Sequence, residues 1–518
     1  MVARPFRSRN PKSSPLWKCF HAHFDHFTAA YPRDYQSRYG VLRGVIPEVV
    51  DKFMQCGDFA KGFARVRCDE CSHEYLLAFS CKGRWFCPSC HQKKVQIFGA
   101  MLAESIVAVV PHRHLTFTIP KMLRPYFRFH RGLLKQLCRI AHQCVRDFLR
   151  DAFGNAGGVG NGERDGVPAI VMAIHTFGEY LDFHPHLHAL VADGLFDCEG
   201  KFHVMRAGEL AGERVGEITR ERTQDQRGTT DALCAGNHAA LEQLFRARVI
   251  AFLVEVGLLP LDRARMLRGW VHSGFQVHQS RRIAPNECQD MERLAQYIVR
   301  NPFSVSKMQV NRSGDSILYR SGMNAKIKRN FQVFSACDFI AAITQHIPDK
   351  RFQMVRYYGW YSNKMRGQRR KREEEAQEEA ARKSAATAEQ GCGAKGNAAI
   401  EIIEHLAPKA RRIPSRSWRE LIKKVWEVDP LLCPQCHHEM RIVSLINDAQ
   451  IIERILRHVG SGGVDQWVDE VCNHGVRIAP STGPPVEESV AVSGIFDRGQ
   501  LVIEPWLDDP MPDDDCGL

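Results

Sequence analysis

Alternation of apolar and polar side chains predicts strands in the middle of the chain. Alternation is clearest at residues 114–120, and further candidate strands occur at residues 168–177, which are rich in β-forming residues, 184–192 and 275–278. Segments of this length, rich in β-branched and aromatic residues, are typical of half-buried strands. The short connection at residues 178–183 joins two of them directly. We therefore expect an antiparallel sheet and not a βαβ repeat.

Apolar residues at helical spacing predict helices around this sheet. They occur at residues 16–56, 93–109, 129–153, 231–257 and 286–300. The last of these helices should end before Pro302, because proline restricts the residue before it to extended conformations. The polar stretch 206–230 lacks periodicity, and we interpret residues 199–258 as an insertion. Strands and helices together predict an α+β fold.

Length and charge narrow the class of protein. A chain of 518 residues with 44% hydrophobic residues is long enough for roughly two to four domains. It has no apolar run of membrane-spanning length and no apolar signal segment, so we expect a cytoplasmic protein. The net charge is +12 although the last residues, with Asp513, Asp514 and Asp515, are acidic. This excess favours a polyanionic partner, most often nucleic acid; a basic protein without such a partner is the alternative.

Cysteine spacing predicts a zinc site near the N-terminus. Eighteen cysteines without an export signal favour thiols and metal sites over disulfides. Fifteen residues separate the pair Cys68 and Cys71 from the pair Cys87 and Cys90. This spacing suits a hairpin that presents four thiolates to one Zn²⁺, as in a zinc ribbon. One of these four ligands could instead be a nearby residue of a zinc-binding type, namely Cys81, His73 or His91.

Basic and aromatic residues lie within the predicted ribbon. Arg84, Lys93 and Lys94 lie close to Trp85 and Phe86, a composition suited to DNA. A solvated charged surface explains these basic residues nearly as well.

A further Cys-x-x-Cys occurs far along the chain. Cys433 and Cys436 supply two ligands, and His437 or His438 would add a third. No second pair stands at ribbon distance, so a complete zinc site is not assigned there.

Two histidines on one predicted strand form a candidate metal site. His186 and His188 point to the same face, and Leu187 points to the opposite face. Two imidazoles on a stiff strand provide half of a metal site; a hydrogen-bonded pair is the alternative. We interpret His112 and His114, at the start of another strand, as structural.

Two other classes of metal enzyme use paired histidines on strands. A barrel-type hydrolase needs a βα repeat, which the antiparallel pattern disfavours. A cupin-like site needs a glutamate shortly after the second histidine, where this chain has Ala192 and Asp193.

Several motifs, in the same order, resemble those of a known family. They are Cys81-Lys82-Gly83-Arg84-Trp85-Phe86-Cys87-Pro88-Ser89-Cys90, residues 114–120, His175-Thr176-Phe177-Gly178, His184-Pro185-His186-Leu187-His188, Tyr297-Ile298-Val299-Arg300 and Arg356-Tyr357-Tyr358-Gly359. The chain resembles, over roughly residues 50–365, the rolling-circle transposases of the insertion-sequence-ninety-one and common-region (ISCR) group. These are HUH endonucleases, named for two histidines around a hydrophobic residue.

The resemblance implies a palm-like antiparallel sheet and a set of site residues. It implies that His186 and His188 bind Mg²⁺ or Mn²⁺ and that Tyr297 is the nucleophile. Some members of the wider family carry a second tyrosine one helical turn away, where this chain has Arg293. The chain therefore resembles the single-tyrosine form, with Arg293 and Arg300 as candidate DNA contacts.

The catalytic metal needs a third ligand. Because Mg²⁺ prefers oxygen ligands, we expect an oxygen-bearing side chain beside the two histidines. Glu179, in the connection between two strands, is the first candidate. The alternative is that Glu179 is a solvent-exposed carboxylate in a turn, without a metal-binding role. The other candidates are Asp182, His184 and Asn301.

The function implied by the resemblance is DNA transposition. Tyrosine attack on a metal-bound phosphate of single-stranded DNA would leave a 5′-phosphotyrosine and a free 3′-hydroxyl, while Zn²⁺ would be structural. Such a protein would act in the cytoplasm, at the nucleoid. A non-catalytic zinc-ribbon DNA-binding regulator is the alternative.

These patterns give a predicted domain organisation. It comprises a helical lead-in (1–55), a zinc ribbon (56–100), an HUH catalytic domain (108–365), a charged linker (366–400), a small, mostly helical C-terminal unit (401–475) and an acidic, largely disordered tail (476–518).

Overall fold

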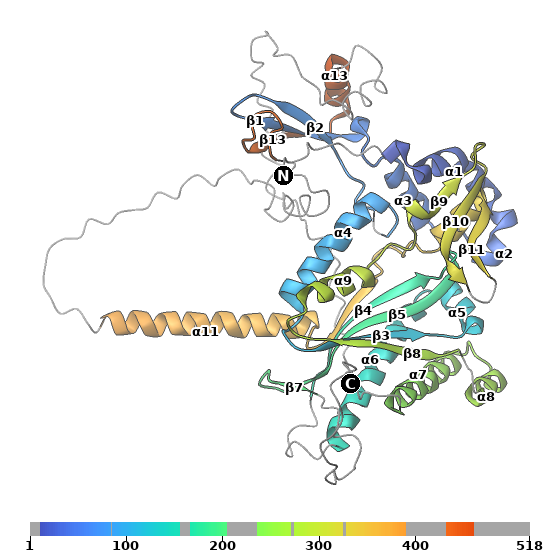
Figure 1. Cartoon of the computed structure of the whole chain (residues 1–518), viewed down its shortest axis with the longest axis vertical. Helices are drawn as coiled ribbons and strands as arrows, with labels where there is room; N and C mark the ends of the chain where they lie inside the picture. The colour runs from blue at the N-terminus through green and yellow to red at the C-terminus, as the bar shows by residue number, and fades with distance from the viewer. Residues whose placement is uncertain are drawn as a thin grey trace, which may run out of the picture. The chain divides into compact units, whose positions relative to one another are not determined.

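The alternating segments of the central region pair into one five-stranded sheet in the computed structural model (Figure 1). Its strands, in order across the sheet, are β12 (Val355–Gly359), β4 (Ala169–Phe177), β5 (Phe183–Ala192), β3 (His112–Thr118) and β8 (Gln276–Ile283). All neighbouring strands are antiparallel. The predicted α+β class with an antiparallel sheet is confirmed, and the arrangement excludes a βα barrel for this sheet.

The structure describes residues 11–83, 85–155, 166–204, 236–270, 274–324, 328–389 and 431–459. The chain divides into two compact units. The first unit comprises Met1–Ile97, Asn301–Gln353 and Ile403–Leu518, and the second comprises Phe98–Arg300 and Met354–Ile402.

The second unit contains the five-stranded sheet and several helices. These helices are the end of α4 (Pro88–Met101), α5 (Arg124–Phe129), α6 (Leu133–Asn155), α7 (Gly236–Glu255), α8 (Leu261–Gly269), α9 (Cys288–Ile298) and α11 (Asn363–Glu389). The hairpin β6 (Gly194–Phe196) and β7 (Phe202–Val204) follows β5.

Different helices pack on the two faces of this sheet. Leu187 on β5 pairs in register with Phe117 on β3, and Phe117 packs edge-on against Phe245 of α7 with ring centroids 5.0 Å apart. Helices α6 and α7 lie on this side of the sheet, and α9 lies on the other (Figure 1). The face under α9 carries the histidines of β4 and β5.

Gly359 ends the edge strand β12 in a conformation that requires glycine. Its φ is +58°, and a Cβ atom there would lie 1.8 Å from the carbonyl oxygen of Pro168. This close approach lets the amide of Trp360 donate to that carbonyl, so the Tyr-Tyr-Gly motif anchors the edge of the sheet.

The first unit begins with aromatic helices. Its helices are α1 (Pro15–Asp34), α2 (Gln36–Tyr39), α3 (Val45–Met54), the start of α4, and α10 (Ala336–Thr344). Phe20 and Phe27 of α1 are fully buried, as the helical spacing predicts. A three-stranded sheet of β11 (Arg329–Ser335), β10 (Ser316–Asn324) and β9 (Met308–Val310) also belongs to this unit.

A second small sheet joins distant parts of the sequence. Strand β1 (Phe63–Cys68) lies between β2 (Glu74–Ala78) and β13 (Met440–Ile446), and both pairs are antiparallel. Helix α13 (Ala449–Val459) follows β13. The described part of the predicted unit 401–475 thus contributes a strand to the predicted ribbon.

The two units divide the chain differently from the predicted domains. Residues 301–353 group with the first unit, whereas the sequence placed them in a catalytic domain of 108–365. The predicted linker is helical where it is described, to Glu389. Arg84, residues 205–235 of the predicted insertion and the acidic tail lie outside the described residues.

Candidate active site and metal sites

Three histidines meet on one face of the five-stranded sheet. His175 of β4 lies directly opposite His186 of β5 in the antiparallel register, and His188 is two residues further along β5. Opposite residues in an antiparallel pair project to the same face, as do residues two apart on one strand. One ring nitrogen from each histidine lies within 4.8 Å of the other two.

Hydrogen bonds leave one nitrogen of each ring for a metal ion. His175 Nε2 donates to the carbonyl oxygen of Ile298 at 2.6 Å, and His186 Nδ1 donates to that of His184 at 2.8 Å. His188 Nδ1 lies 2.8 Å from His114 Nε2. The remaining buried nitrogens, His175 Nδ1 and His188 Nε2, have no hydrogen-bond partner among the described residues. Outer hydrogen bonds of this kind fix the tautomer and ring orientation of metal-binding histidines.

Burial keeps these imidazoles neutral, as metal ligation requires. Burial, followed by the nearby His186, holds the pKa of His175 well below its ordinary value. Burial also lowers the pKa of His186 to about 4. The pKa of His188 is lowered further, mainly by burial and then by His175. Desolvation disfavours the imidazolium form, so the lone pairs remain available.

Tyr297 lies over the histidines at the end of α9. Its ring meets that of His188 edge-on, with centroids 5.3 Å apart, and that of His114 at 6.0 Å. Tyr297 is 40% exposed, so solvent reaches the side chain. The Arg300 guanidinium stands 4.3 Å from the centre of the Tyr297 ring, at cation–π distance.

Helix α9 is positioned by an apolar face. Met291, Ala295 and Ile298 are buried at a spacing of four and three residues, which makes one helical stripe. A Cβ on Gly99 of α4 would lie 2.7 Å from Cγ of Gln296. Close packing against this glycine therefore sets the place from which Tyr297 projects.

The structure does not bring the predicted carboxylate to the histidines. Glu179 is exposed in the turn between β4 and β5 and does not belong to the group of possible metal ligands formed by the histidines. Asp182 is also exposed, and His184 contributes its backbone carbonyl. Asn301 is half-buried, and its side-chain amide has no hydrogen-bond partner among the described residues. His175, which the sequence interpretation included only as part of a motif, replaces Glu179 in this arrangement.

The two other paired histidines have different roles. His112 is fully buried, with Nδ1 2.7 Å from the carbonyl oxygen of Val110 and Nε2 2.7 Å from the Tyr361 hydroxyl. It is structural, as the sequence interpretation held. His114 contacts His188 and so supports the site, which that interpretation missed.

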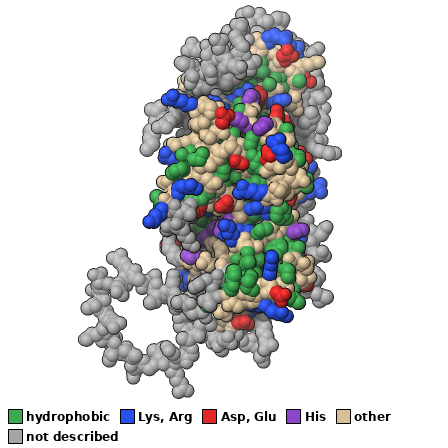
Figure 2. All heavy atoms as spheres, turned by 90° about the vertical axis from the view of Figure 1, so that its right-hand side faces the viewer, with side chains coloured by type: hydrophobic (Ala, Val, Ile, Leu, Met, Phe, Trp, Pro, Cys, Tyr) green, Lys and Arg blue, Asp and Glu red, His purple; other side chains and the backbone are tan. Residues whose placement is uncertain are grey.

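The candidate DNA-contacting residues differ in exposure. Arg300 and Arg293 are exposed, and Arg293 forms an ion pair of 3.2 Å with Asp290. Lys93 is half-buried, whereas Lys94 is only 8% exposed and has little surface for DNA. Figure 2 shows Lys and Arg side chains in several separate groups across one face.

Eight cysteines form two groups of four. The four ligands of the predicted zinc site are split between these groups. Cys87 and Cys90 lie with Cys56 and Cys81, whereas Cys68 and Cys71 lie with Cys433 and Cys436. The prediction that Cys68, Cys71, Cys87 and Cys90 share one ion is wrong, because β1 and the start of α4 carry the two pairs into different clusters. The described cysteines form no disulfide.

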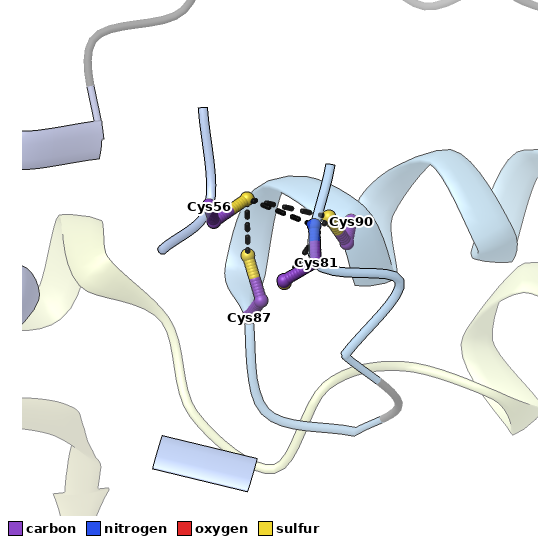
Figure 3. A group of neighbouring side chains, drawn as sticks. All are labelled: Cys56, Cys81, Cys87 and Cys90. Carbon is purple, nitrogen blue, oxygen red and sulfur yellow. Dashed lines mark hydrogen bonds between the residues drawn. The ribbon is translucent and has the colours of Figure 1, made fainter. Parts of the chain in front are cut away.

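The first cysteine cluster has the geometry of a tetrathiolate zinc site. The four side chains point toward one another, with Cys87 directly before α4 and Cys90 in its first turn (Figure 3). Cys56 Sγ lies 3.7 Å from Cys90 Sγ and 3.8 Å from Cys87 Sγ, and Cys81 Sγ lies 3.6 Å from Cys90 Sγ. Zn–S bonds of about 2.3 Å at tetrahedral angles place sulfurs roughly 3.8 Å apart. Contact with Cys56 raises the pKa of Cys81 and Cys87, because several thiolates this close together would repel one another. A bound cation offsets this repulsion and lets the thiols lose their protons.

Comparisons with known proteins agree with this organisation. The transposase zinc-binding domain family matches residues 23–119, and a putative transposase family matches residues 169–369. The transposase for insertion sequence element IS801 of Pseudomonas savastanoi pv. phaseolicola is 26% identical over 336 residues, covering 64% of this chain and 73% of the relative. Putative transposase y4qJ of Sinorhizobium fredii (strain NBRC 101917 / NGR234) is 23% identical over 349 residues, covering 65% and 80%. No solved structure matches.

The fold, the cysteine clusters and these similarities define a transposase, a DNA-processing enzyme with a zinc-binding domain. Together the two family matches and the IS801 relative support an IS91-family transposase with an N-terminal zinc-binding domain, as the motifs predicted. No helix among the described residues is long and apolar enough to cross a membrane.

Proposed function

We propose that this transposase cuts and rejoins single-stranded DNA through attack of Tyr297 on a backbone phosphate. The observation that carries the proposal is the placement of Tyr297. Its ring lies edge-on to His188, 5.3 Å between centroids, while the side chain stays open to solvent. A nucleophile and a set of metal-ligand nitrogens thus face the same space.

The three histidines fit a divalent cation, with His175 Nδ1, His186 Nε2 and His188 Nε2 as its ligands. A cation bound there would polarise the phosphate and stabilise its developing negative charge. Three imidazoles suit Mn²⁺ better than Mg²⁺, which demands oxygen ligands. We therefore propose Mn²⁺ as the preferred ion and Mg²⁺ as a weaker substitute.

The proposed reaction conserves the energy of the phosphodiester bond. The Tyr297 hydroxyl oxygen forms a bond to phosphorus and loses its proton to solvent, while the bond from phosphorus to the 3′ oxygen breaks. The 3′ oxygen takes up a proton, which leaves a free 3′-hydroxyl and a 5′-phosphotyrosine. A later attack by a 3′-hydroxyl reverses these bond changes and releases the tyrosine, so no ATP is needed.

Arg300 supports the nucleophile in this proposal. Its guanidinium lies over the rings of both Tyr297 and Phe177, at 4.3 and 5.3 Å from their centres. The stacking fixes the charge beside the tyrosine, where an incoming phosphate would pass. Arginine is suited to this role because its planar group stacks on aromatic rings and binds phosphate oxygens.

Covalent capture of single-stranded DNA tests the proposal. Purified protein is incubated with an oligonucleotide of the element end and Mn²⁺, and the adduct is resolved under denaturing conditions. Tyr297→Phe should abolish the adduct and leave DNA binding within about twofold, since only a hydroxyl is lost. Tyr126→Phe, on half-buried α5, is the matched control and should form adduct as the wild type does.

The outcomes separate the rival functions. An adduct that persists in Tyr297→Phe would assign the nucleophile to another residue. DNA binding without any adduct in the wild type, on several end sequences and with either metal, would favour a non-catalytic DNA-binding role.

A further inference from the structure

Two segments far apart in the sequence form the same turn. Cys68-Asp69-Glu70-Cys71 and Cys433-Pro434-Gln435-Cys436 each begin at a cysteine whose amide donates to the carbonyl five residues on. These bonds run from Cys68 to His73 at 2.8 Å and from Cys433 to His438 at 2.9 Å.

The match extends to the backbone. Ser72 and His437 each directly follow the second cysteine, and both have positive φ, 57° and 60°. A left-handed residue that closes a Cys-x-x-Cys turn is uncommon for a non-glycine side chain. Its occurrence at both places indicates two equivalent turns built to aim paired thiols.

The two turns face each other. Cys68 Sγ lies 3.4 Å from Cys436 Sγ, and Cys71 Sγ lies 3.4 Å from Cys433 Sγ. All four sulfurs lie within 4.8 Å of one another. These distances approach the edge of a tetrahedron around Zn²⁺, roughly 3.8 Å.

Packing on both sides of the cluster holds the segments together. Strand β13 pairs with β1 from Met440 opposite Cys68 to Ile446 opposite Phe63. Beside the thiols, Val66 packs with Leu431 and Met440 in a small buried cluster.

The other end of the sheet is covered by α13. Its buried Ile452 joins Phe59, Phe63 and Leu76, with Ile455 and Leu456 packed alongside. The C-terminal segment thus supplies a turn, a strand and a covering helix to one small fold. So small a core needs a further constraint to hold together two segments that are 368 residues apart in the sequence.

We propose that Cys68, Cys71, Cys433 and Cys436 bind a second structural Zn²⁺, which closes a ribbon assembled from both ends of the chain. This site is separate from the cluster of Cys56, Cys81, Cys87 and Cys90. Residues 431–459 lie outside both matched families, 23–119 and 169–369. The ion links the C-terminal segment to the zinc-binding domain, whatever reaction the histidine site performs.

Zinc content of the full-length protein tests the proposal. Elemental analysis should find two Zn²⁺ per wild-type chain and one in Cys433→Ser/Cys436→Ser. The matched control, Cys198→Ser/Cys288→Ser, removes two exposed cysteines outside the clusters and should keep two. One ion in the wild type, or two in the cluster variant, would overturn the proposal.

A measurement on the wild type covers the case in which the variant fails to fold. In the zinc-loaded protein, N-ethylmaleimide should label Cys198 at least tenfold faster than Cys433 and Cys436, because bound thiolates are shielded. After zinc is removed with a chelator, all four thiols of the cluster should become reactive together. Labelling of Cys433 and Cys436 at the rate of Cys198 before chelation would exclude the second site.

Discussion

His175 Nδ1 is a buried ring nitrogen without a hydrogen-bond partner among the described residues, although Nε2 of the same ring is bonded to Ile298. An unpaired buried nitrogen costs free energy unless a ligand satisfies it. His175→Ala should therefore weaken Mn²⁺ binding and reduce adduct formation by at least about 100-fold, whereas Glu179→Ala should change either by less than about twofold. Mn²⁺ titrations of adduct yield measure both; a larger effect at Glu179 would restore it as the third ligand.

The sequence showed which residues lie on the candidate strands but not how the strands pair. The period of two correctly placed His186 and His188 on one face and Leu187 on the other. A lone histidine in a buried strand, such as His175, looks like an ordinary core residue. Counting back from the turn closed by Gly178 and Asp182 pairs His175 with Pro185. A register shift between His175 and Phe177 sets His175 opposite His186 instead, and the sequence does not show this shift.

At the scale of an element, His112 ties β3 to the residues that follow β12. The Tyr361 hydroxyl, which contacts His112 Nε2, also accepts from the Ala108 amide. Burial lowers the pKa of His112 to about 4, so the folded chain keeps this ring neutral while the unfolded chain protonates it near 6.5. The neutral His112 ring therefore contributes to the free energy of unfolding in full above pH 6.5. This contribution declines as the pH falls toward 4, by at most about 3 kcal/mol.

His112→Gln should remove this part of the pH dependence. Urea unfolding at pH 7.5 and pH 4.5 gives the difference for each protein. The wild type should lose more stability than the variant on acidification, even if the variant is less stable at pH 7.5. Equal losses in both proteins would show that His112 is protonated in the folded state.

Elements defined by local periodicity were the most predictable. Four strands of the central sheet, β3, β4, β5 and β8, and the helix that carries Tyr297 lie where the sequence pattern predicted them. Strand β12 was recognised only as the motif Arg356-Tyr357-Tyr358-Gly359, because a segment of five residues is too short for a clear pattern. Strand β13 fell in a unit expected to be mostly helical, and its pairing with β1 depends on contacts over more than 360 residues, which periodicity does not encode.

At the scale of the whole molecule, cysteine proximity in sequence was misleading. Cys87 and Cys90 stand at ribbon distance from Cys68 and Cys71, yet they belong to the other cluster. The Cys-x-x-Cys spacing identifies residues that can form a metal-binding turn. Which two turns share an ion depends on which strands pair, here β1 with β13. Sequence likeness misleads in the same way, because Cys433-Pro434-Gln435-Cys436 resembles Cys87-Pro88-Ser89-Cys90 more closely than it resembles its actual partner turn.

The two kinds of metal site should respond differently to chelation. Four thiolates place four negative charges around a Zn²⁺, partly in buried positions such as Cys56 and Cys87, and structural zinc of this kind is held by roughly 10 kcal/mol or more. Three neutral imidazoles place no charge around their ion, which must keep a position open for phosphate. Brief treatment with EDTA should therefore abolish adduct formation while the zinc content stays constant, and added Mn²⁺ should restore the adduct. Elemental analysis and the adduct assay on the same samples measure both; undiminished adduct formation in EDTA would contradict a metal role for the three histidines.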